Sequence, residues 1–461
     1  MVQFGTSGLR GLAVDLTDAL VANYATVFVD RMPGDGTLLV GRDLRDSSSR
    51  IAAAVAAGAA RAGHRAIDCG VLPTPALAME SAARGTAAIM VTGSHIPGDR
   101  NGLKFYDRGA EIAKSDEVWL NAGVAALPDT PPPSSEFSET ADAAGRFLKR
   151  YSDFFASDAL SGMRVGVFEH SSAARELMAP LLKNLGADVV SLGRSDSFVA
   201  VDTEAVSDDA REKLSGWARE HGLHAIISTD GDADRPMLAD ANGSIVPGDR
   251  LGPLTARLLA AKAIVTPVSS NTLVDLMADW HIVRTRIGSP YVIAEMEALT
   301  GQDVVGYEPN GGFLLGYDAQ LAGRTLAPLM TRDFALPILA VLVEANARGL
   351  SVAALNADLP RRFTATDRLT NVPTEISKAI GAELIASNFD VLPEDARDVT
   401  DIDTTDGARM TLEDGRIVTV RPSGNAPELR CYAEADRLEA AERLMKETLS
   451  ALRKAVDAAP T

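Results

Sequence analysis

The chain has 461 residues, enough for about three or four domains of roughly 100–200 residues each. Hydrophobic residues make up 46% and charged residues 23% of the chain, which is typical of a soluble globular protein. The formal net charge of −18 argues against sequence-independent binding to nucleic acid or to an anionic membrane surface, because both require clustered Lys and Arg.

Other whole-chain features point to the same class. Cys69 and Cys431 lie far apart and form no metal-ligand spacing, so we expect no zinc site and reduced thiols, as in the cytoplasm. The first residues, MVQFGTSGLRG, lack a signal-peptide pattern, and no apolar run approaches the roughly 20 residues that span a bilayer. We therefore expect a cytoplasmic protein with neither nucleic acid nor membrane as a partner.

A pattern of three elements recurs along the first 310 or so residues: an amphipathic helix, a glycine and a short apolar strand. The glycine supplies the left-handed residue that ends many helices. Helices that alternate with strands predict α/β domains with substantially parallel sheets, here three related ones. The three occurrences are 51–62, Gly63 and 66–71; 173–185, Gly186 and 187–192; and 291–299, Gly301 and 304–307.

Composition suggests the domain boundaries. The proline-rich stretch 128–135 can sustain neither a helix nor a central strand, and weaker breaks lie near 246–249 and 360–362. After the last break the pattern changes to α+β, with a frayed tail at 455–461. The predicted helices there are 374–388 and 438–455, and the predicted strands are 401–405, 416–420 and 428–434. The predicted domains are 1–135, 136–248, 249–361 and 362–461.

A buried strand at 86–92 ends at Gly93-Ser94-His95, and Lys104 follows ten residues after Ser94. Ligands of open α/β sheets bind beyond the carboxyl ends of strands, and a serine hydroxyl there can carry a transferable group. A phosphorylated serine would have a charge of about −1.5 to −2 and would need cationic neighbours such as His95, Arg100 and Lys104. The tripeptide alone is more simply explained as a turn that closes a strand.

Three carboxylates, Asp230, Asp232 and Asp234, follow a second predicted strand at 224–227. Oxygen ligands at alternate positions of a tight turn suit Mg²⁺. A calcium EF-hand loop is excluded because Arg235 and Ala241 occupy the positions that need glycine and a bidentate acid. An aspartyl-phosphate motif fits badly, and a solvated acidic turn remains the alternative.

Two later turns can bind a ligand with hydroxyl and phosphate groups. Glu308 and Asn310, in the segment 306–312, can exchange hydrogen bonds with sugar hydroxyls. In the segment 421–430, arginines at either end of a Ser-Gly-Asn turn could clamp a phosphate. The clamp residues are Arg421, Ser423, Gly424, Asn425 and Arg430. Each turn alone is an ordinary loop.

Taken together and in this order, the four segments resemble the motifs of the α-D-phosphohexomutase superfamily, which includes phosphomannomutases and phosphoglucomutases. The segments read VTGSHIPGDRNGLKFY, DGDADR, GYEPNGG and RPSGNAPELR, and the N-terminal FGTSGLRG and the GRD at 41–43 agree with the family. The chain departs from the usual motifs at Gly93, Asn310, Gly312, Asn425 and Ala426. The departures in the sugar loop leave the preferred sugar open.

The resemblance implies three related α/β mutase domains followed by an α+β domain like the TATA-binding protein. It implies that Ser94 is phosphorylated and binds Mg²⁺ together with Asp230, Asp232 and Asp234. Lys104 is the first candidate for proton transfer, with His95 as support or alternative, and we expect Arg10 and Arg235 to add positive charge. Glu308 and Asn310 would recognise the sugar, and the clamp would hold the phosphate that is not reacting.

The implied activity is that of a phosphomannomutase, an isomerase that acts through a hexose 1,6-bisphosphate, which also serves as activator. The alternatives are a phosphoglucomutase, a dual-specificity enzyme and, less favoured, a phosphoglucosamine mutase. Two further alternatives come from other functional classes. One is a non-catalytic regulator that binds sugar phosphates, and the other is a phosphatase. The expected partners are hexose phosphates, and the expected assembly is a monomer or a homodimer.

Overall fold

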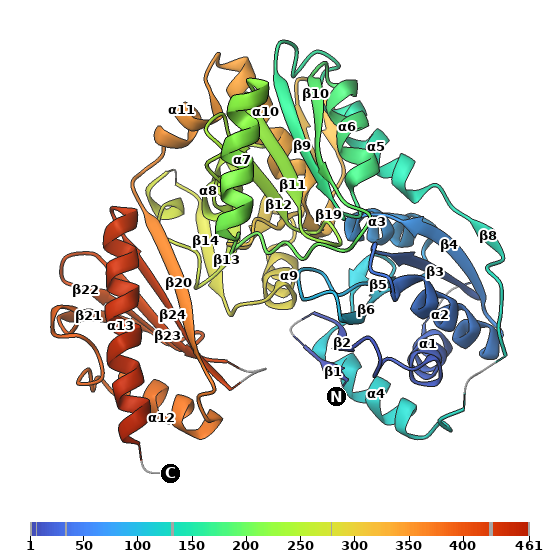
Figure 1. Ribbon diagram of the computed structural model, residues 1–461, viewed down its shortest axis with the longest axis horizontal. Coiled ribbons are helices and arrows are strands. Elements are labelled where there is room, and N and C mark those ends of the chain that lie inside the picture. Colours follow the sequence, from blue (N-terminus) through green and yellow to red (C-terminus); the bar gives the residue numbers. More distant parts are fainter. Residues whose placement is uncertain are drawn as a thin grey trace. The chain divides into compact units, whose positions relative to one another are not determined.

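The structure is a computed structural model that describes residues 2–5, 7–32, 35–130, 133–277, 279–423 and 427–459 (Figure 1). The chain forms two compact units. Unit one comprises Met1–Ile264 and Met296–Asp358, and unit two comprises Val265–Glu295 and Leu359–Thr461. The predicted boundaries at residues 135, 248 and 361 stay predictions.

Unit one begins with an eight-stranded sheet in the order β1-β2-β6-β5-β3-β4-β8, with β7 paired to β6. Strands β4, β3 and β5 are parallel, whereas β5, β6 and β2 pair antiparallel, so the sheet is mixed rather than substantially parallel. Helices α1 and α2 cover one face and α3 the other (Figure 1). The elements are β1 (Gln3–Phe4), β2 (Leu9–Leu12), α1 (Asp18–Arg31), β3 (Thr37–Arg42), α2 (Ser48–Arg61), β4 (Arg65–Val71), α3 (Thr74–Arg84), β5 (Ala87–Val91), β6 (Arg100–Asp107), β7 (Ala110–Glu111), α4 (Lys114–Ala125) and β8 (Glu139–Thr140).

The remainder of unit one repeats the α/β arrangement. Strands β10, β9 and β11 are parallel, and β12 closes that sheet antiparallel to β11. Strands β15, β16 and β19 pair antiparallel, and α8 packs on α10. The elements are α5 (Ala143–Phe154), β9 (Arg164–His170), α6 (Arg175–Asn184), β10 (Asp188–Arg194), α7 (Asp208–His221), β11 (Ala225–Thr229), β12 (Pro236–Asp240), α8 (Gly248–Leu258), β15 (Val304–Tyr307), β16 (Phe313–Leu315), β17 (Ala319–Leu321), β18 (Arg324–Leu326), β19 (Leu329–Asp333), α10 (Ala335–Ala347) and α11 (Val352–Ala357).

The recurring helix–glycine–strand pattern is confirmed. It corresponds to α2 with β4, to α6 with β10, and to α9 (Ser289–Ala298) with β15. Gly63, Gly186 and Gly301 have φ values of 78°, 90° and 92°, in the left-handed region that glycine enters without steric cost. The glycines therefore allow each chain reversal between helix and strand.

Unit two carries an antiparallel five-stranded sheet in the order β20-β24-β23-β22-β21, which confirms an α+β C-terminal part. Strands β20 and β22 were not predicted. Helix α13 runs to Ala458 rather than fraying from residue 455, because Val456 packs into the core beneath it. Strand β13 (Ala263–Pro267) begins in unit one and ends in unit two. The other elements are η1 (Val274–Leu276), β14 (His281–Thr285), β20 (Phe363–Thr370), α12 (Thr374–Ile385), η2 (Glu394–Ala396), β21 (Val399–Asp403), β22 (Ala408–Leu412), β23 (Ile417–Pro422), β24 (Glu428–Ala435) and α13 (Leu438–Ala458).

Two fully buried strands of unit one position the residues that the sequence singled out. All five residues of β5 and all five of β11 are buried, as expected for the apolar runs AAIMV and AIIST. Ser94 follows the end of β5, and Asp230 follows the end of β11. Because both strands are fixed by the core, the loops after them start from rigid points.

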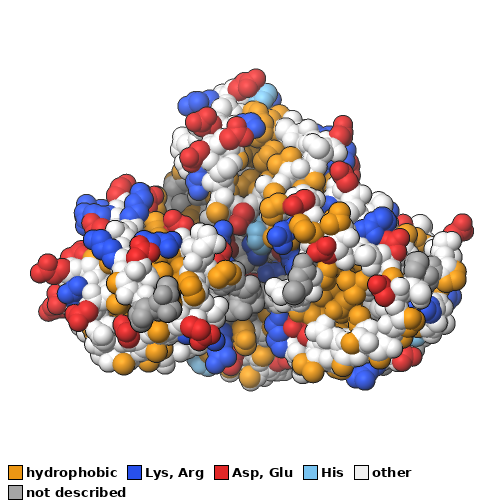
Figure 2. All heavy atoms as spheres, turned by 60° about the horizontal axis from the view of Figure 1, so that its bottom comes forward, with side chains coloured by type: hydrophobic (Ala, Val, Ile, Leu, Met, Phe, Trp, Pro, Cys, Tyr) orange, Lys and Arg blue, Asp and Glu red, His pale blue; other side chains and the backbone are white. Residues whose placement is uncertain are grey.

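Two whole-chain expectations can be compared with the structure. Cys69 and Cys431 are both buried free thiols, which agrees with the expected reduced state. In the described part of the chain, none of the helices combines the length and apolar character needed to cross a bilayer. Figure 2 shows acidic and basic side chains intermingled over the displayed face, with a histidine and several basic side chains close together near its middle.

Candidate active site

Ser94 lies in a loop whose geometry is set by the strands on either side. Strand β6 returns antiparallel to β5 and pairs Met90 with Lys104, so the lysine ten residues from Ser94 comes back beside the same strand. Ser94 has a φ of 53°, which is uncommon for a residue other than glycine, and its backbone N–H donates to Thr92 Oγ1 at 2.7 Å. Such a conformation persists only where surrounding contacts hold it.

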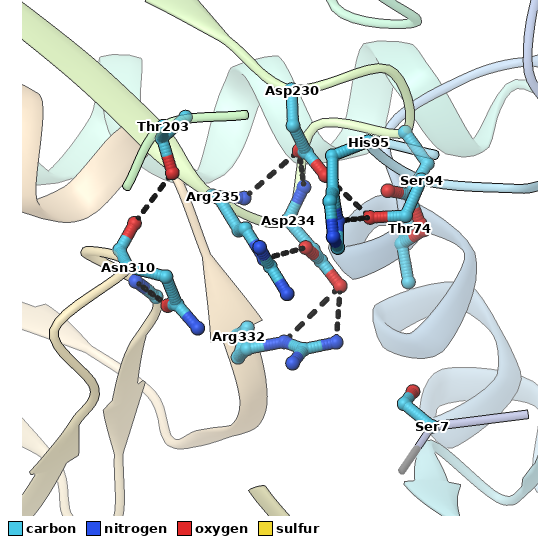
Figure 3. A network of polar contacts seen from close by, with 12 residues as sticks. Ser7, Thr74, Ser94, His95, Thr203, Asp230, Asp234, Arg235, Asn310 and Arg332 are labelled. Atoms are coloured by element: carbon cyan, nitrogen blue, oxygen red, sulfur yellow. Dashed lines mark hydrogen bonds and ion pairs between the residues drawn. The ribbon is translucent and has the colours of Figure 1, made fainter. Parts of the chain in front are cut away.

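The Ser94 hydroxyl points at the second predicted loop. Its Oγ donates a hydrogen bond to Asp230 Oδ2 at 2.6 Å and lies 3.3 Å from His95 Nδ1 (Figure 3). These residues belong to segments 136 positions apart in the chain. The structure therefore brings together the serine and the acidic turn that the sequence picked out separately.

The acidic turn is tightly folded. Asp230 Oδ1 accepts the backbone N–H groups of Asp234 and Arg235 at 3.2 Å each. Asp232 Oδ2 accepts from Thr74 Oγ1 and from Lys104 Nζ, both at 2.6 Å. Asp234 Oδ2 also accepts from Lys104 Nζ at 2.6 Å. Lys104 is thus fully buried between two carboxylates.

The three aspartates fit a divalent cation. One carboxylate oxygen from each lies within 4.8 Å of the others, and all three side chains are buried. Within the described residues, Asp232 Oδ1 and Asp234 Oδ1 are buried without a hydrogen-bond partner. Buried carboxylate oxygens are normally paired, and Mg²⁺ takes oxygen ligands of this kind. The alternative interpretation of the sequence, a solvated acidic turn, does not agree with the burial of all three side chains.

Burial and neighbouring charge shift the pKa values of these groups in different directions. Burial, reinforced by Asp232 and Asp234, raises the pKa of Asp230 well above its usual range. Burial would also raise the pKa of Asp232, but the Lys104 ammonium outweighs it and lowers that pKa. Burial would lower the pKa of Lys104, but the two carboxylates outweigh it and raise it, so Lys104 is held as an ammonium.

His95 has the opposite character. Burial, followed by the charge of Arg235, lowers the pKa of His95 to about 3. Its imidazole is therefore neutral near pH 7. A neutral imidazole beside Ser94 and a buried ammonium on the aspartates are the two candidate proton carriers, as the sequence suggested.

Arg45 organises the serine loop and was missed by the sequence analysis. Its buried guanidinium donates to four loop carbonyls at 2.6–2.9 Å and to Asp43 Oδ2 at 3.1 Å, and it stacks over the Phe198 ring. A Cβ at Gly93 would lie 2.5 Å from the Arg45 Cζ atom, which explains why this chain has glycine there. The carbonyls belong to Ser94, Ile96, Pro97 and Arg100. The available signal was the position of Arg45, two residues after the Gly41-Arg42-Asp43 motif.

The predicted sugar loop lies in the same unit. Glu308 and Asn310 are buried, and Asn310 Oδ1 accepts from the Gly312 N–H at 2.9 Å. Arg332, which the sequence did not single out, donates from Nε at 3.1 Å and from its terminal NH₂ at 2.6 Å to Asp234 Oδ2 (Figure 3). Its other terminal nitrogen lies 3.5 Å from Glu308 Oε2.

Two predicted arginines border the cluster. Arg10 donates to the Gly93 carbonyl at 2.7 Å. Arg235 has its Nε 3.9 Å from Asp234 Oδ1. The buried Nε atoms of both arginines have no hydrogen-bond partner in the regions that the structure describes. Spare guanidinium donors near a serine hydroxyl suit a phosphate group.

The predicted clamp lies in unit two. Arg421 on β23 pairs in register with Arg430 on β24, and Ser423 N–H donates to the Glu428 carbonyl at 2.9 Å. Arg421 forms an ion pair with Asp406 at 2.8 Å. The hairpin thus brings the two arginines side by side. Gly424 and Asn425 lie outside the described residues.

Models of one family match nearly the whole chain. They are described as phosphoglucomutase/phosphomannomutase alpha/beta/alpha domains I, II and III and the C-terminal domain. Domain I matches residues 1–128, domain II residues 146–243, domain III residues 247–363 and the C-terminal domain residues 356–451.

Curated relatives and solved structures agree. The chain is 46% identical to a phosphomannomutase of Sinorhizobium fredii over 470 residues, covering 98% of each, and 42% identical to one of Salmonella muenchen, covering 97% of this chain and 95% of the relative. A phosphoglucomutase/phosphomannomutase family protein from Burkholderia thailandensis has a TM-score of 0.75 at 21% identity, covering 99% and 98%. The N-acetylphosphoglucosamine mutase of Aspergillus fumigatus, solved with GlcNAc-6P and magnesium, has a TM-score of 0.60 at 14% identity, covering 98% and 96%.

Proposed function

Because the chain belongs to the phosphoglucomutase/phosphomannomutase family, we propose that it is a phosphomannomutase that interconverts mannose 6-phosphate and mannose 1-phosphate. The observation that carries this proposal is the Ser94 Oγ–Asp230 contact inside a buried group of three aspartates. Both full-length relatives named above are phosphomannomutases, which favours mannose over the other sugars.

In the proposed reaction, phosphorylated Ser94 donates its phosphoryl group to the free C1 or C6 hydroxyl of the sugar phosphate. The bond from phosphorus to Ser94 Oγ breaks, and a bond from phosphorus to the sugar oxygen forms, giving mannose 1,6-bisphosphate. The second transfer returns the other phosphate to Ser94 Oγ and releases the isomer. Phosphoryl transfer depends mainly on in-line positioning and charge neutralisation.

The residues of unit one would divide the work. Asp230, Asp232 and Asp234, with the Ser94 phosphate, would hold Mg²⁺, which supplies neutralisation of the transferring group. Lys104 is the first candidate for proton transfer and His95 the alternative. Arg10 and Arg235 would add positive charge. If Lys104→Met keeps the wild-type kcat and His95→Asn loses it, His95 is the group that transfers the proton.

The other residues would hold the sugar phosphate. Glu308 and Asn310 would bind the sugar hydroxyls, and Arg421, Ser423, Gly424, Asn425 and Arg430 would bind the distant phosphate. Hexose 1,6-bisphosphate would serve as intermediate and activator. The free thiols at Cys69 and Cys431 support a cytoplasmic location.

Steady-state kinetics test the proposal. The kcat/KM values for mannose 1-phosphate, glucose 1-phosphate and glucosamine 1-phosphate are measured with Mg²⁺ and a trace of hexose 1,6-bisphosphate. We expect a clear preference for mannose. Comparable mannose and glucose rates would indicate a dual-specificity enzyme. Turnover of none of the three would overturn the mutase and favour the non-catalytic regulator.

A further inference from the structure

Gly312 and Arg332 form a matched pair beside the sugar loop. A Cβ built at Gly312 would lie 2.7 Å from Arg332 Cδ, 2.8 Å from Cγ and 3.1 Å from Cβ. These atoms belong to the stem of the arginine, not to its flexible end, so they cannot easily move aside. The φ of Gly312 lies outside the left-handed region, so the backbone does not require glycine there. The absence of a side chain at residue 312 therefore makes room for Arg332.

The guanidinium of Arg332 connects the acidic turn to the sugar loop. Two of its nitrogens donate to Asp234 Oδ2 at 3.1 and 2.6 Å, and the third lies 3.5 Å from Glu308 Oε2. The side chain is 8% exposed, and that of Glu308 is 4% exposed. Two nitrogens on one carboxylate fix the plane of the guanidinium, which a lysine ammonium cannot reproduce.

Glu308 retains hydrogen-bonding capacity at that contact. Over the residues that the structure describes, Glu308 Oε2 is buried and has no hydrogen-bond partner, because the 3.5 Å ion pair is longer than a hydrogen bond. A buried carboxylate oxygen of this kind is suited to accept a hydrogen bond from a ligand hydroxyl. Arg332 places a positive charge near Glu308 Oε2 and leaves this oxygen available to accept a hydrogen bond.

The geometry points to Arg332 as the positioning residue that sets sugar discrimination, by holding Glu308 in register with the Asp230–Asp234 turn. Gly312 allows this arrangement because it has no side chain to contact Arg332. This inference rests on the proposed function only for the identity of the sugars. Arg332 acts through Glu308 and Asp234.

The test compares the wild type with Gly312→Ala, Arg332→Lys and the double variant. Gly216→Ala, in α7 with nothing within 4 Å of the added Cβ, is the matched control. Binding of mannose 1-phosphate and glucose 1-phosphate is measured by calorimetry on the dephosphorylated enzyme, which has no phosphoryl group to transfer, and kcat, KM and Tm are measured for each variant. We expect both single variants to reduce the mannose-to-glucose affinity ratio by about tenfold, the scale of one hydrogen bond to a charged group. KM should rise more than kcat falls.

The double variant separates the pair from two independent defects. If Gly312 matters through Arg332, the double variant will lose no more discrimination than the more impaired single variant. An unchanged affinity ratio in both single variants, or fully additive losses, would overturn the inference, whatever happens to Tm. If the wild type binds mannose 1-phosphate but does not turn it over, the proposed mutase activity is refuted. The mannose-to-glucose affinity ratios of the wild type and the variants would still test the role of Arg332. A wild type that binds neither sugar phosphate would overturn both.

Discussion

The serine and aspartate cluster of unit one and the arginine clamp of unit two differ in how firmly they are held. Ser94, Lys104 and the three aspartates are each at most 2% exposed and bonded across distant segments. The side chains of Arg421 and Arg430 are 19% and 37% exposed. A buried group with several partners has fewer alternative positions than a partly exposed one. The comparison suggests that the cluster is fixed for chemistry and the clamp for binding, so changes should affect kcat in the first and KM in the second.

Removal of the nucleophile should have the largest effect. In Ser94→Ala we expect kcat to fall by about 10⁴-fold or more, because no group remains to carry the phosphoryl group. Ser423→Ala in the clamp is the matched control and should mainly raise KM. Steady-state kinetics on both variants check this. A Ser94→Ala enzyme that keeps a tenth of the wild-type rate would contradict the proposed chemistry.

Removal of the metal should have the next largest effect on activity. Chelation should abolish turnover, and added Mg²⁺ should restore it, because the cation contributes several kcal/mol of charge stabilisation, on the order of 10³-fold in rate. In calorimetry, Asp232→Asn should weaken Mg²⁺ binding by about 100-fold or more. Asp406→Asn, at the ion pair of the clamp, should leave Mg²⁺ affinity unchanged. Equal affinities in the two variants would place the metal elsewhere.

Arg45 tests whether the cluster is positioned by its surroundings. Arg45→Lys removes most of the bonds to the loop carbonyls, and we expect kcat to fall by about 100-fold, the scale associated with a displacement of about 1 Å. The control is Arg50→Lys, whose side chain is 44% exposed and pairs with Asp18. That variant should keep wild-type kcat. If Arg45→Lys also keeps wild-type kcat, the loop does not depend on this guanidinium.

Substitutions in the clamp should change KM rather than kcat. Arg430→Lys loses the planar fork that suits a phosphate, so KM should rise about tenfold while kcat changes by less than about threefold. Arg416→Lys serves as control, because Arg416 pairs with Asp414 and Asp395 in the same unit. A large fall of kcat at unchanged KM in Arg430→Lys would erase the distinction between the two regions.

Thiol labelling offers the smallest effect and compares the cores of the two units. Burial raises the pKa of both Cys69 and Cys431 to about 12, so at pH 8.5 far less thiolate is present than in an unfolded chain. We expect alkylation of both native thiols to be at least about 100-fold slower than in denaturant. Rapid labelling of one thiol would show that its unit opens readily under native conditions.

The sequence predicted local features better than contacts between distant segments. The three glycines after helices were predicted because a left-handed cap is a local requirement, and Ser94 and Asp230 were found because each ends an apolar strand. Arg45 and Arg332 were missed because their roles depend on segments 24 to 98 positions away in the chain. Strand β22 was missed because its sequence, ARMTL, carries little strand signal, and its pairing with β21 and β23 determines its conformation.

The most direct test of the central claim is the intact mass of the purified enzyme before and after mixing with excess mannose 1-phosphate whose phosphate oxygens are labelled with heavy oxygen. The account predicts a wild-type fraction heavier by one phosphate, located at Ser94 by peptide mapping. On mixing, the unlabelled phosphate should pass to the sugar and leave on mannose 6-phosphate, and the second transfer should place the labelled phosphate of the substrate on Ser94. An unlabelled phosphate that stays on Ser94 while the sugar isomerises, or isomerisation by enzyme that never carries a phosphate, would contradict the account.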